Sequence, residues 1–424
     1  MIKNINKIVT YTFFLKLVIF FGNFILNILL AKFLEKSSYG EYSTIVSYGS
    51  VIGLFLLLGL NVENMRLLSS FQRISFKSFF NIQRAFIIFL FFTILLFSIL
   101  TYLLYIYFNY ANIILIFIFS VCFCMQLYMS DLYRGLKNIQ KGVFFGGALT
   151  NLFIIFLLLC YYYFNQIINL EVVLNITFLS YIINNILAIT HIIIKRNVFF
   201  LSENKELNLK LNIKHIKRSF GYWIQNLLVY SIPHLMIILI SINNNTQNVA
   251  IYNIAIKFVM VSSFGIILLN TILAPYISEM FASNDINKLE KLVRKYTAYA
   301  FYFSFSGLSF LFLFGHDLLE ILFDESYQDS YIILMIIATG QLINLYIGTG
   351  NLILQMSKKI KTLLFANFIS YIPLLIFIFL FNKSLTLIEF AFFHAFMVIL
   401  SSLVSAYYVK KIFNISINAK FSFK

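Results

Sequence analysis

Charged residues are scarce in this chain. They make up 11% of its 424 residues, whereas hydrophobic residues make up 61%. A soluble domain carries roughly 25% charged residues, so this composition cannot cover the surface of a soluble globule. Only three prolines interrupt the chain, and its apolar runs are continuous. Continuous runs also exclude a transmembrane β-barrel, in which apolar and polar residues alternate.

Cysteine and phosphate-binding motifs are equally sparse. The three cysteines, Cys122, Cys124 and Cys160, all lie inside apolar runs, so no disulfide framework is implied. Cys122 and Cys124 are two residues apart, a spacing that does not place two metal ligands on one helix face. No G-x-x-x-x-G-K-[ST] sequence is present, which argues against direct ATP hydrolysis.

Long apolar segments are what the chain has instead. A helix needs about 20 apolar residues to cross the hydrocarbon of a bilayer. Twelve segments meet this length, and we expect each to be a membrane-spanning helix. They lie near residues 9–31, 42–60, 85–106, 112–130, 143–164, 172–194, 220–242, 249–274, 297–315, 330–354, 363–382 and 389–409.

The basic residues that give the chain its net charge of +16 are distributed in agreement with these predicted spans. With the N-terminus in the cytoplasm, 27 of the 32 lysines and arginines fall on the cytoplasmic side, and only Lys32, Lys36 and Lys383 fall on the opposite side. Basic residues accumulate on the cytoplasmic side of membrane proteins. We therefore predict a multi-pass membrane protein with both termini in the cytoplasm. Because the basic residues are not gathered on one soluble module, we expect no nucleic-acid partner.

The basic segment 195–219 divides the twelve expected helices six and six. The halves echo each other weakly: Tyr-Gly-Glu-Tyr at 39–42 opens the second helix, and Val-Ala-Ile-Tyr at 249–252 opens the eighth. Transporters are often built from such repeats, with the substrate site between them. We predict an all-α integral membrane protein with an N-terminal six-helix lobe at 1–200 and a C-terminal six-helix lobe at 201–424.

The cytoplasmic connector 284–296 is predicted to be an interfacial helix. Leu289, Leu292, Val293 and Tyr296 fall at helical spacing on one face. We expect Asn284 or Asp285 to cap its start. A connecting helix is also expected in 195–219.

Two lysines fall inside the expected spans, Lys16 and Lys257, whereas no Asp or Glu lies deep in any span. A lysine within the membrane costs several kcal/mol and therefore usually marks a cavity. Further polar residues share helix faces, and with the lysines they form the predicted substrate-binding set: Lys16, Asn23, Asn27, Asn226, Tyr230, His234, Asn253 and Lys257.

Lysines in a wet cavity without nearby acids favour an anionic guest such as a phosphate or pyrophosphate headgroup. A stripe of Gln341, Asn344, Gly348, Asn351 and Gln355 in the tenth span is assigned equally to cavity lining and to helix–helix hydrogen bonding. His234 is either a proton-coupling residue or a hydrogen-bonded member of its stripe.

Several motifs, in order along the chain, resemble a known family. They are Leu-Ala-Lys-Phe-Leu at 30–34, Tyr-Gly-Glu-Tyr-Ser at 39–43, Ala-Ile-Tyr-Asn-Ile-Ala-Ile-Lys at 250–257, Ala-Pro-Tyr-Ile-Ser at 274–278, Leu-Phe-Asp-Glu-Ser-Tyr at 322–327 and Gly-Asn-Leu-Ile-Leu at 350–354. Together they resemble the polysaccharide flippases of the MOP superfamily, the Wzx-type transporters of O-antigen units. The resemblance covers essentially the full length.

This resemblance implies two six-helix lobes around a central cavity lined by helices one, two, seven and eight. It implies alternating access that carries a polyprenyl-pyrophosphate-linked oligosaccharide from the cytoplasmic to the outer leaflet for polysaccharide or lipopolysaccharide biosynthesis. The expected partners are the lipid-linked oligosaccharide, membrane lipid and other glycan-assembly membrane proteins. No cofactor is expected apart from a coupling ion, H⁺ or Na⁺. Relatives often carry an acidic residue midway along the seventh helix, where this chain has His234, so an inherited coupling mechanism is in doubt.

Three alternatives stay open. A membrane-embedded glycan polymerase or glycosyltransferase would need a larger extracytoplasmic loop than 316–329, which holds five acids. A multidrug exporter of the same superfamily would need membrane-embedded acids to hold cations. A MOP exporter of another lipid-linked cargo cannot be separated by sequence. We expect a transporter, not an enzyme.

Overall fold

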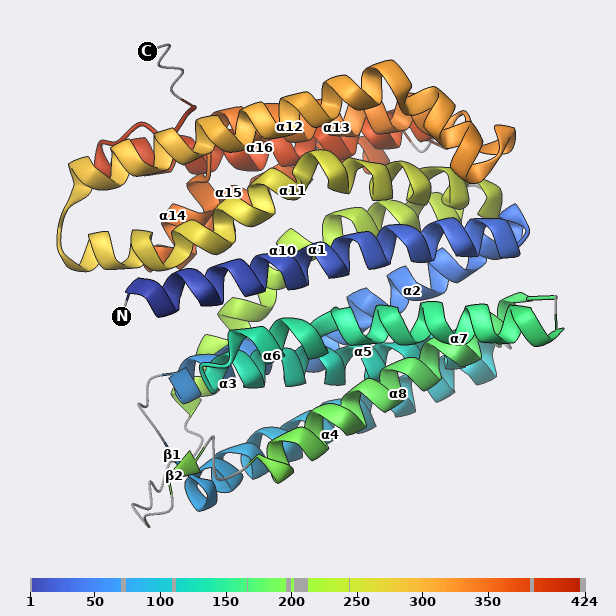
Figure 1. Cartoon of the computed structure of the whole chain (residues 1–424), viewed down its shortest axis with the longest axis horizontal. Coiled ribbons are helices and arrows are strands. Elements are labelled where there is room, and N and C mark those ends of the chain that lie inside the picture. The colour runs from blue at the N-terminus through green and yellow to red at the C-terminus, as the bar shows by residue number, and fades with distance from the viewer. Residues whose placement is uncertain are drawn as a thin grey trace. The chain divides into compact units, whose positions relative to one another are not determined.

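The computed structural model describes residues 2–69, 74–108, 112–165, 167–195, 200–201, 213–243, 245–381 and 385–419. Nearly all of these residues are helical (Figure 1), which confirms the predicted all-α class. The helices of the N-terminal part are α1 (Ile2–Phe33), α2 (Lys36–Leu57), α3 (Leu60–Ser69), α4 (Phe76–Phe108), α5 (Asn112–Gly135), α6 (Ile139–Val143), the π-turn η1 (Phe144–Ala148), α7 (Leu149–Asn165) and α8 (Leu170–Ile194).

The remaining helices are α10 (Ile213–Asn243), α11 (Thr246–Ala282), α12 (Ile286–Phe323), the 3₁₀ turn η2 (Glu325–Tyr327), α13 (Ser330–Ile347), α14 (Gly350–Met356), α15 (Ile360–Phe381) and α16 (Leu387–Phe413). Two short strands, β1 (Ile74–Ser75) and β2 (Phe200–Leu201), pair in parallel.

Ten helices in the described part of the chain are long and apolar enough to cross a membrane, or eleven if the bent pair α2–α3 is one span. The 37-residue helix α11 occupies the place of the eighth predicted span. In the described part of the chain, helices therefore lie at the positions of the predicted spans.

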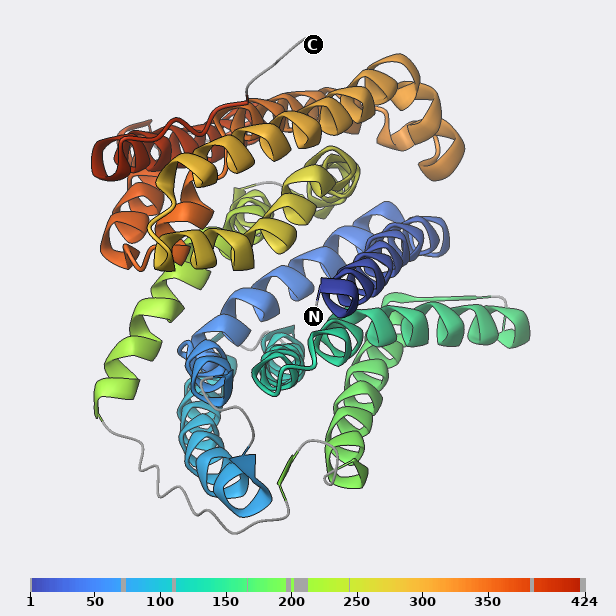
Figure 2. The same ribbon diagram turned by 60° about the vertical axis from the view of Figure 1, so that its left-hand side comes forward.

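The fold has two lobes, formed by the compact units Met1–Leu227 and Leu228–Lys424. The boundary between these units falls inside α10, whose first half belongs to the N-terminal unit. The connecting helix expected in 195–219 lies largely outside the described residues. Figure 2 shows the helices of each unit from a second side.

Side-chain caps explain several helix starts. The carboxamides of Asn138, Asn169 and Asn245 accept hydrogen bonds from backbone N–H groups three residues later, at the starts of α6, α8 and α11. Thr386 and Glu389 form a reciprocal capping box at the start of α16. These caps end the short polar connections and fix where the apolar helices begin.

Two expected spans are broken by glycine, and here the sequence prediction is wrong. The chain bends by 53° between α2 and α3, where Leu58 and Gly59 adopt φ values of 44° and 72°. A single span near 42–60 was expected here. The span expected at 330–354 is also split, because Gly348 ends α13 with φ 109°. A side chain at Gly348 would place its Cβ 2.3 Å from the Ile417 carbonyl oxygen, so only glycine fits this close approach.

The predicted interfacial connector at 284–296 is continuous with the ninth span. Both are parts of α12, a helix of 38 residues. Its amphipathic pattern is as expected, since Leu289 and Val293 are fully buried while Lys291 and Lys295 are exposed. Asp285 occupies the N-cap position but makes no side-chain capping hydrogen bond.

Candidate functional site

The N-terminal unit places Lys16, Asn23 and Asn27 along α1. Lys16 is half-buried and lies in the first half of α1. Asn27 is 6% exposed, and its Oδ1 accepts a hydrogen bond of 2.7 Å from the Tyr39 hydroxyl of α2. Its Nδ2 donates to the Asn23 carbonyl oxygen at 2.6 Å. The Asn27 carboxamide therefore connects α1 to α2, which is a structural use of this predicted site residue.

The C-terminal unit places His234 on α10 and Lys257 on α11, within the range over which the Lys257 charge acts on the His234 ring. Lys257 lies 11 residues into α11, or about 16 Å along the helix axis. In the described part of the chain, no ion pair or hydrogen bond involves its ammonium group. Asn253, one turn before Lys257, is 5% exposed. The C-terminal unit thus carries these three predicted residues on α10 and α11, with Asn253 and Lys257 one turn apart on α11.

The other two predicted residues of α10 have different surroundings. Asn226 is half-buried, and Tyr230 is 64% exposed. Both residues lie on α10 within about two turns before His234. Pro233 lies in the same helix, directly before His234. Whether Lys16 and Lys257 face one shared cavity stays a prediction.

The polar stripe of the tenth span connects helices to one another. Asn344 donates to Gln341 at 3.2 Å and accepts a hydrogen bond from Ser402 of α16. Beyond the break, Asn351 donates to Ser401 of α16 at 3.1 Å. Because Gly348 ends α13, the stripe does not form one continuous helix face. These contacts favour helix–helix hydrogen bonding over cavity lining.

A buried acid in the N-terminal unit went unrecognised in the sequence. Glu63 of α3 is fully buried, and its carboxylate accepts hydrogen bonds from Arg66 Nε at 2.8 Å and Arg66 Nη2 at 2.6 Å. His215, at the start of α10, lies 2.7 Å from the same carboxylate. No acid was expected deep in any span from the sequence, whereas the bend after α2 turns Glu63 into the unit. Its spacing of three from Arg66 was the available signal.

Further buried polar side chains surround α3. Asn61 donates to the Asp131 carboxylate at 2.7 Å, and Arg134 donates to its other oxygen at 3.0 Å. A second group, Asn64, Gln83 and Tyr128, exchanges four hydrogen bonds of 2.6 to 3.0 Å among three helices. All three side chains are nearly inaccessible to solvent. Both acids are thus neutralised by cations of the same unit, and the Asn64 and Gln83 amides satisfy each other.

No group of three or more His, Cys, Asp or Glu residues suited to a metal ion is found among the described residues. The arrangement offers cationic and amide groups, which suit binding of an anionic, hydroxyl-rich ligand by charge and hydrogen bonds.

Comparison with known proteins agrees with this fold. Residues 222–380 match the MatE family. The chain resembles the Vibrio cholerae MATE transporter VcmN in its bent form, with 12% identity, a TM-score of 0.59, and coverage of 96% of this chain and 98% of that one. It also resembles the lipid II flippase MurJ in its inward closed conformation, with 14% identity, a TM-score of 0.64, and coverage of 95% and 87%.

A third similar structure is the inward-facing conformation of a multidrug resistance MATE family transporter of the MOP superfamily. Its identity is 13%, its TM-score 0.57, and the coverage is 90% of this chain and 95% of that one. No curated protein matches the sequence. The chain therefore has the two-lobed fold of MATE-type transporters over almost its whole length, and the segment similar to the MatE family begins in α10.

Proposed function

We propose that this protein is a flippase that moves a polyprenyl-pyrophosphate-linked oligosaccharide from the cytoplasmic to the outer leaflet of the bacterial inner membrane. The polyprenyl chain stays in lipid, and the headgroup crosses by alternating access between the two lobes. Support comes from the MOP-type fold, the MatE segment, and the likeness to a flippase whose named cargo is lipid II. The positive-inside distribution places both termini in the cytoplasm in this proposal.

Lys257 is the observation that carries the proposal. This lysine lies well inside α11 beside His234, and no carboxylate in the described part of the chain pairs with it. A charge within the membrane needs a counter-charge, because leaving it alone costs several kcal/mol. A pyrophosphate supplies that counter-charge, and Asn253 and Tyr230 offer hydrogen bonds to attached sugars. Lys16 provides a second cation from the other unit.

The buried acids argue against a cationic cargo. Glu63 is paired with Arg66 and His215, and Asp131 is paired with Arg134. Neither carboxylate therefore offers the unneutralised negative charge that would attract a cationic drug. A multidrug exporter of the same fold is the competing function that the experiment below separates.

The test is translocation in a strain that lacks its own O-unit flippase. Wild type, Lys257→Gln, Lys257→Arg and Lys16→Gln are compared at matched membrane expression, with the exposed lysine variant Lys359→Gln as control. We expect wild type, Lys257→Arg and Lys359→Gln to restore surface glycan, and Lys257→Gln to lose at least 10-fold, which about 1.4 kcal/mol of headgroup binding would produce.

Other outcomes have defined meanings. If Lys257→Gln and Lys16→Gln both restore surface glycan as wild type does, the site assignment is wrong although the cargo assignment stands. If wild type fails to restore glycan but confers resistance to cationic drugs, the protein is an exporter of the other kind. If lipid-linked units reach the outer leaflet without this protein and only their polymerisation is missing, it is an enzyme.

A further inference from the structure

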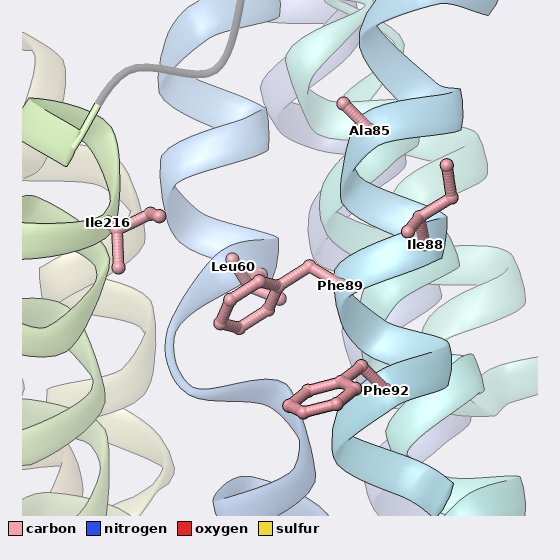
Figure 3. Close-up of a pocket in the computed structure, with 6 residues that line it drawn as sticks. All are labelled: Leu60, Ala85, Ile88, Phe89, Phe92 and Ile216. Atoms are coloured by element: carbon pink, nitrogen blue, oxygen red, sulfur yellow. The ribbon is translucent and has the colours of Figure 1, made fainter.

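The N-terminal unit has an apolar groove that neither the lysines nor the polar clusters use. Its volume is about 440 Å³, and six apolar side chains line it. They are Leu60 of α3, Ala85, Ile88, Phe89 and Phe92 of α4, and Ile216 of α10. Figure 3 shows the Phe89 and Phe92 rings pointing from α4 toward Leu60, with Ile216 on the opposite wall.

The groove opens on the lipid-facing side of the unit. Ile88 is 59% exposed, Phe92 is 56% exposed and Ile216 is 40% exposed. The α4 residues lie at i, i+3, i+4 and i+7, so they form one continuous helix face. A hollow of this kind among side chains that face hydrocarbon is filled by a hydrocarbon chain rather than by water.

Two exposed basic residues adjoin lining residues of the groove along the chain. Arg84 precedes Ala85 and lies one turn before Ile88, on the same side of α4. Lys217 follows Ile216 in α10, and both basic side chains are exposed. Arg84 and Lys217 lie within about ten residues of the starts of α4 and α10. The distribution of lysines and arginines assigns these helix starts to the cytoplasmic side.

An apolar groove whose lining residues adjoin two exposed cations matches one class of ligand. An anionic phospholipid has a hydrocarbon chain for the groove and a phosphate for the cations, and the cytoplasmic leaflet is rich in such lipids. The groove also borders the bend at Leu58 and Gly59, where α10 approaches so closely that a Cβ at Gly59 would lie 2.1 Å from the Ser219 carbonyl oxygen. A lipid chain here would fill the space beside this junction.

We propose that this groove binds one acyl chain of an anionic phospholipid of the cytoplasmic leaflet, whose phosphate is held by Arg84 and Lys217. The site is separate from the proposed cargo site, because its lining contains no polar side chain and none of the predicted substrate-binding residues. It therefore does not depend on which cargo the protein carries.

The experiment measures lipid binding to the purified, delipidated full-length protein by native mass spectrometry. Dioleoyl phosphatidylglycerol and dioleoyl phosphatidylcholine are titrated separately. We expect phosphatidylglycerol to bind more tightly, and Arg84→Gln and Lys217→Gln each to raise its Kd about 5-fold, the change that corresponds to about 1 kcal/mol per basic residue. Binding of phosphatidylcholine should not change. Lys359→Gln, which removes an exposed charge from the other unit, is the matched control and should bind as wild type does.

A second variant tests the groove itself without altering charge. Ala85→Phe should fill the groove and weaken binding of both lipids, and circular dichroism checks that the helices remain. Equal binding of the two lipids by wild type, or unchanged binding by Arg84→Gln and Lys217→Gln, would overturn the proposal. Displacement of phosphatidylglycerol by an equimolar polyprenyl phosphate would also overturn it, since the groove would then serve the cargo's lipid chain.

Discussion

The buried carboxylate of Glu63 allows a quantitative test of how α3 is held. Its side chain is fully buried, whereas the Arg66 side chain is 38% exposed. Arg66→Ala removes two charge-assisted hydrogen bonds and leaves the carboxylate with His215 alone. Breaking a buried pair by removing one partner costs about 3–5 kcal/mol, and the remaining His215 contact places this case near the lower value. Glu63→Gln leaves no buried charge, so we expect a smaller loss of about 1.5–3 kcal/mol.

The double variant Glu63→Gln, Arg66→Ala distinguishes this explanation from simple loss of contacts. If the cost of Arg66→Ala is mainly the unpaired carboxylate, neutralising that carboxylate recovers part of the stability. We therefore expect the double variant to be at least as stable as Arg66→Ala, so that the two effects are not additive.

Trp223 provides the readout, since it is the only tryptophan of the chain. Its ring packs edge-on against Phe55 of α2, with the centroids 5.2 Å apart, two turns along α10 from His215. Unfolding in SDS followed by tryptophan fluorescence therefore reports directly on the junction of α10 with α2 and α3.

Arg294→Ala is the control, because the Arg294–Glu290 pair is longer, at 3.4 Å, and both side chains are about a quarter exposed. Its removal should cost no more than about 1 kcal/mol. Equal losses for Arg294→Ala and Arg66→Ala, or strictly additive losses in the double variant, would refute the reasoning.

Three further changes use the same SDS titration. Gly59→Ala should destabilise the protein by about 2 kcal/mol or more, because the residue has φ 72° and its Cβ would meet the Ser219 carbonyl oxygen. The control Gly221→Ala, whose Cβ would have nothing within 4 Å, should be neutral or slightly stabilising. Equal effects of the two variants would contradict the close approach of α10. Tyr128→Phe should cost about 1–3 kcal/mol, because its hydroxyl donates to Gln83 and accepts from Asn64 in a buried network; a neutral result would mean that water replaces the hydroxyl. Thr386→Ala should cost about 1 kcal/mol by removing the N-cap of α16, and a loss near zero would show that Glu389 alone holds this helix start.

The positions of the long helices could be predicted because apolar length alone dictates them. The expected spans at 112–130 and 172–194 correspond to α5 and α8. Helix ends were missed where a helix continues beyond the apolar stretch. For example, α12 begins at Ile286 rather than near 297, because its first turns are amphipathic and carry no strong apolar signal.

The breaks could not be predicted from local sequence. Gly59 and Gly348 resemble other glycines inside apolar runs. Their conformations are required by the approach of Ser219 and Ile417, which are distant in sequence. The same bend determines the burial of Glu63, so local sequence does not reveal that the fold encloses this acid.

The polar residues of the spans fall into two groups: those whose hydrogen-bond or ion-pair partner lies in the same unit, and Lys257. Asn27, Glu63 and Asp131 are each satisfied by groups of their own unit, from Tyr39, Arg66 and Arg134 respectively. A side chain whose partner is supplied by the fold stabilises the fold, and its type alone does not reveal this in the sequence. Lys257 differs, since the part of the chain that the structure describes gives its ammonium group no counter-charge. A cation held in this way within a membrane-spanning helix has a ligand as its natural partner, and for this reason we base the proposed binding of a pyrophosphate headgroup on Lys257 rather than on the amides around it.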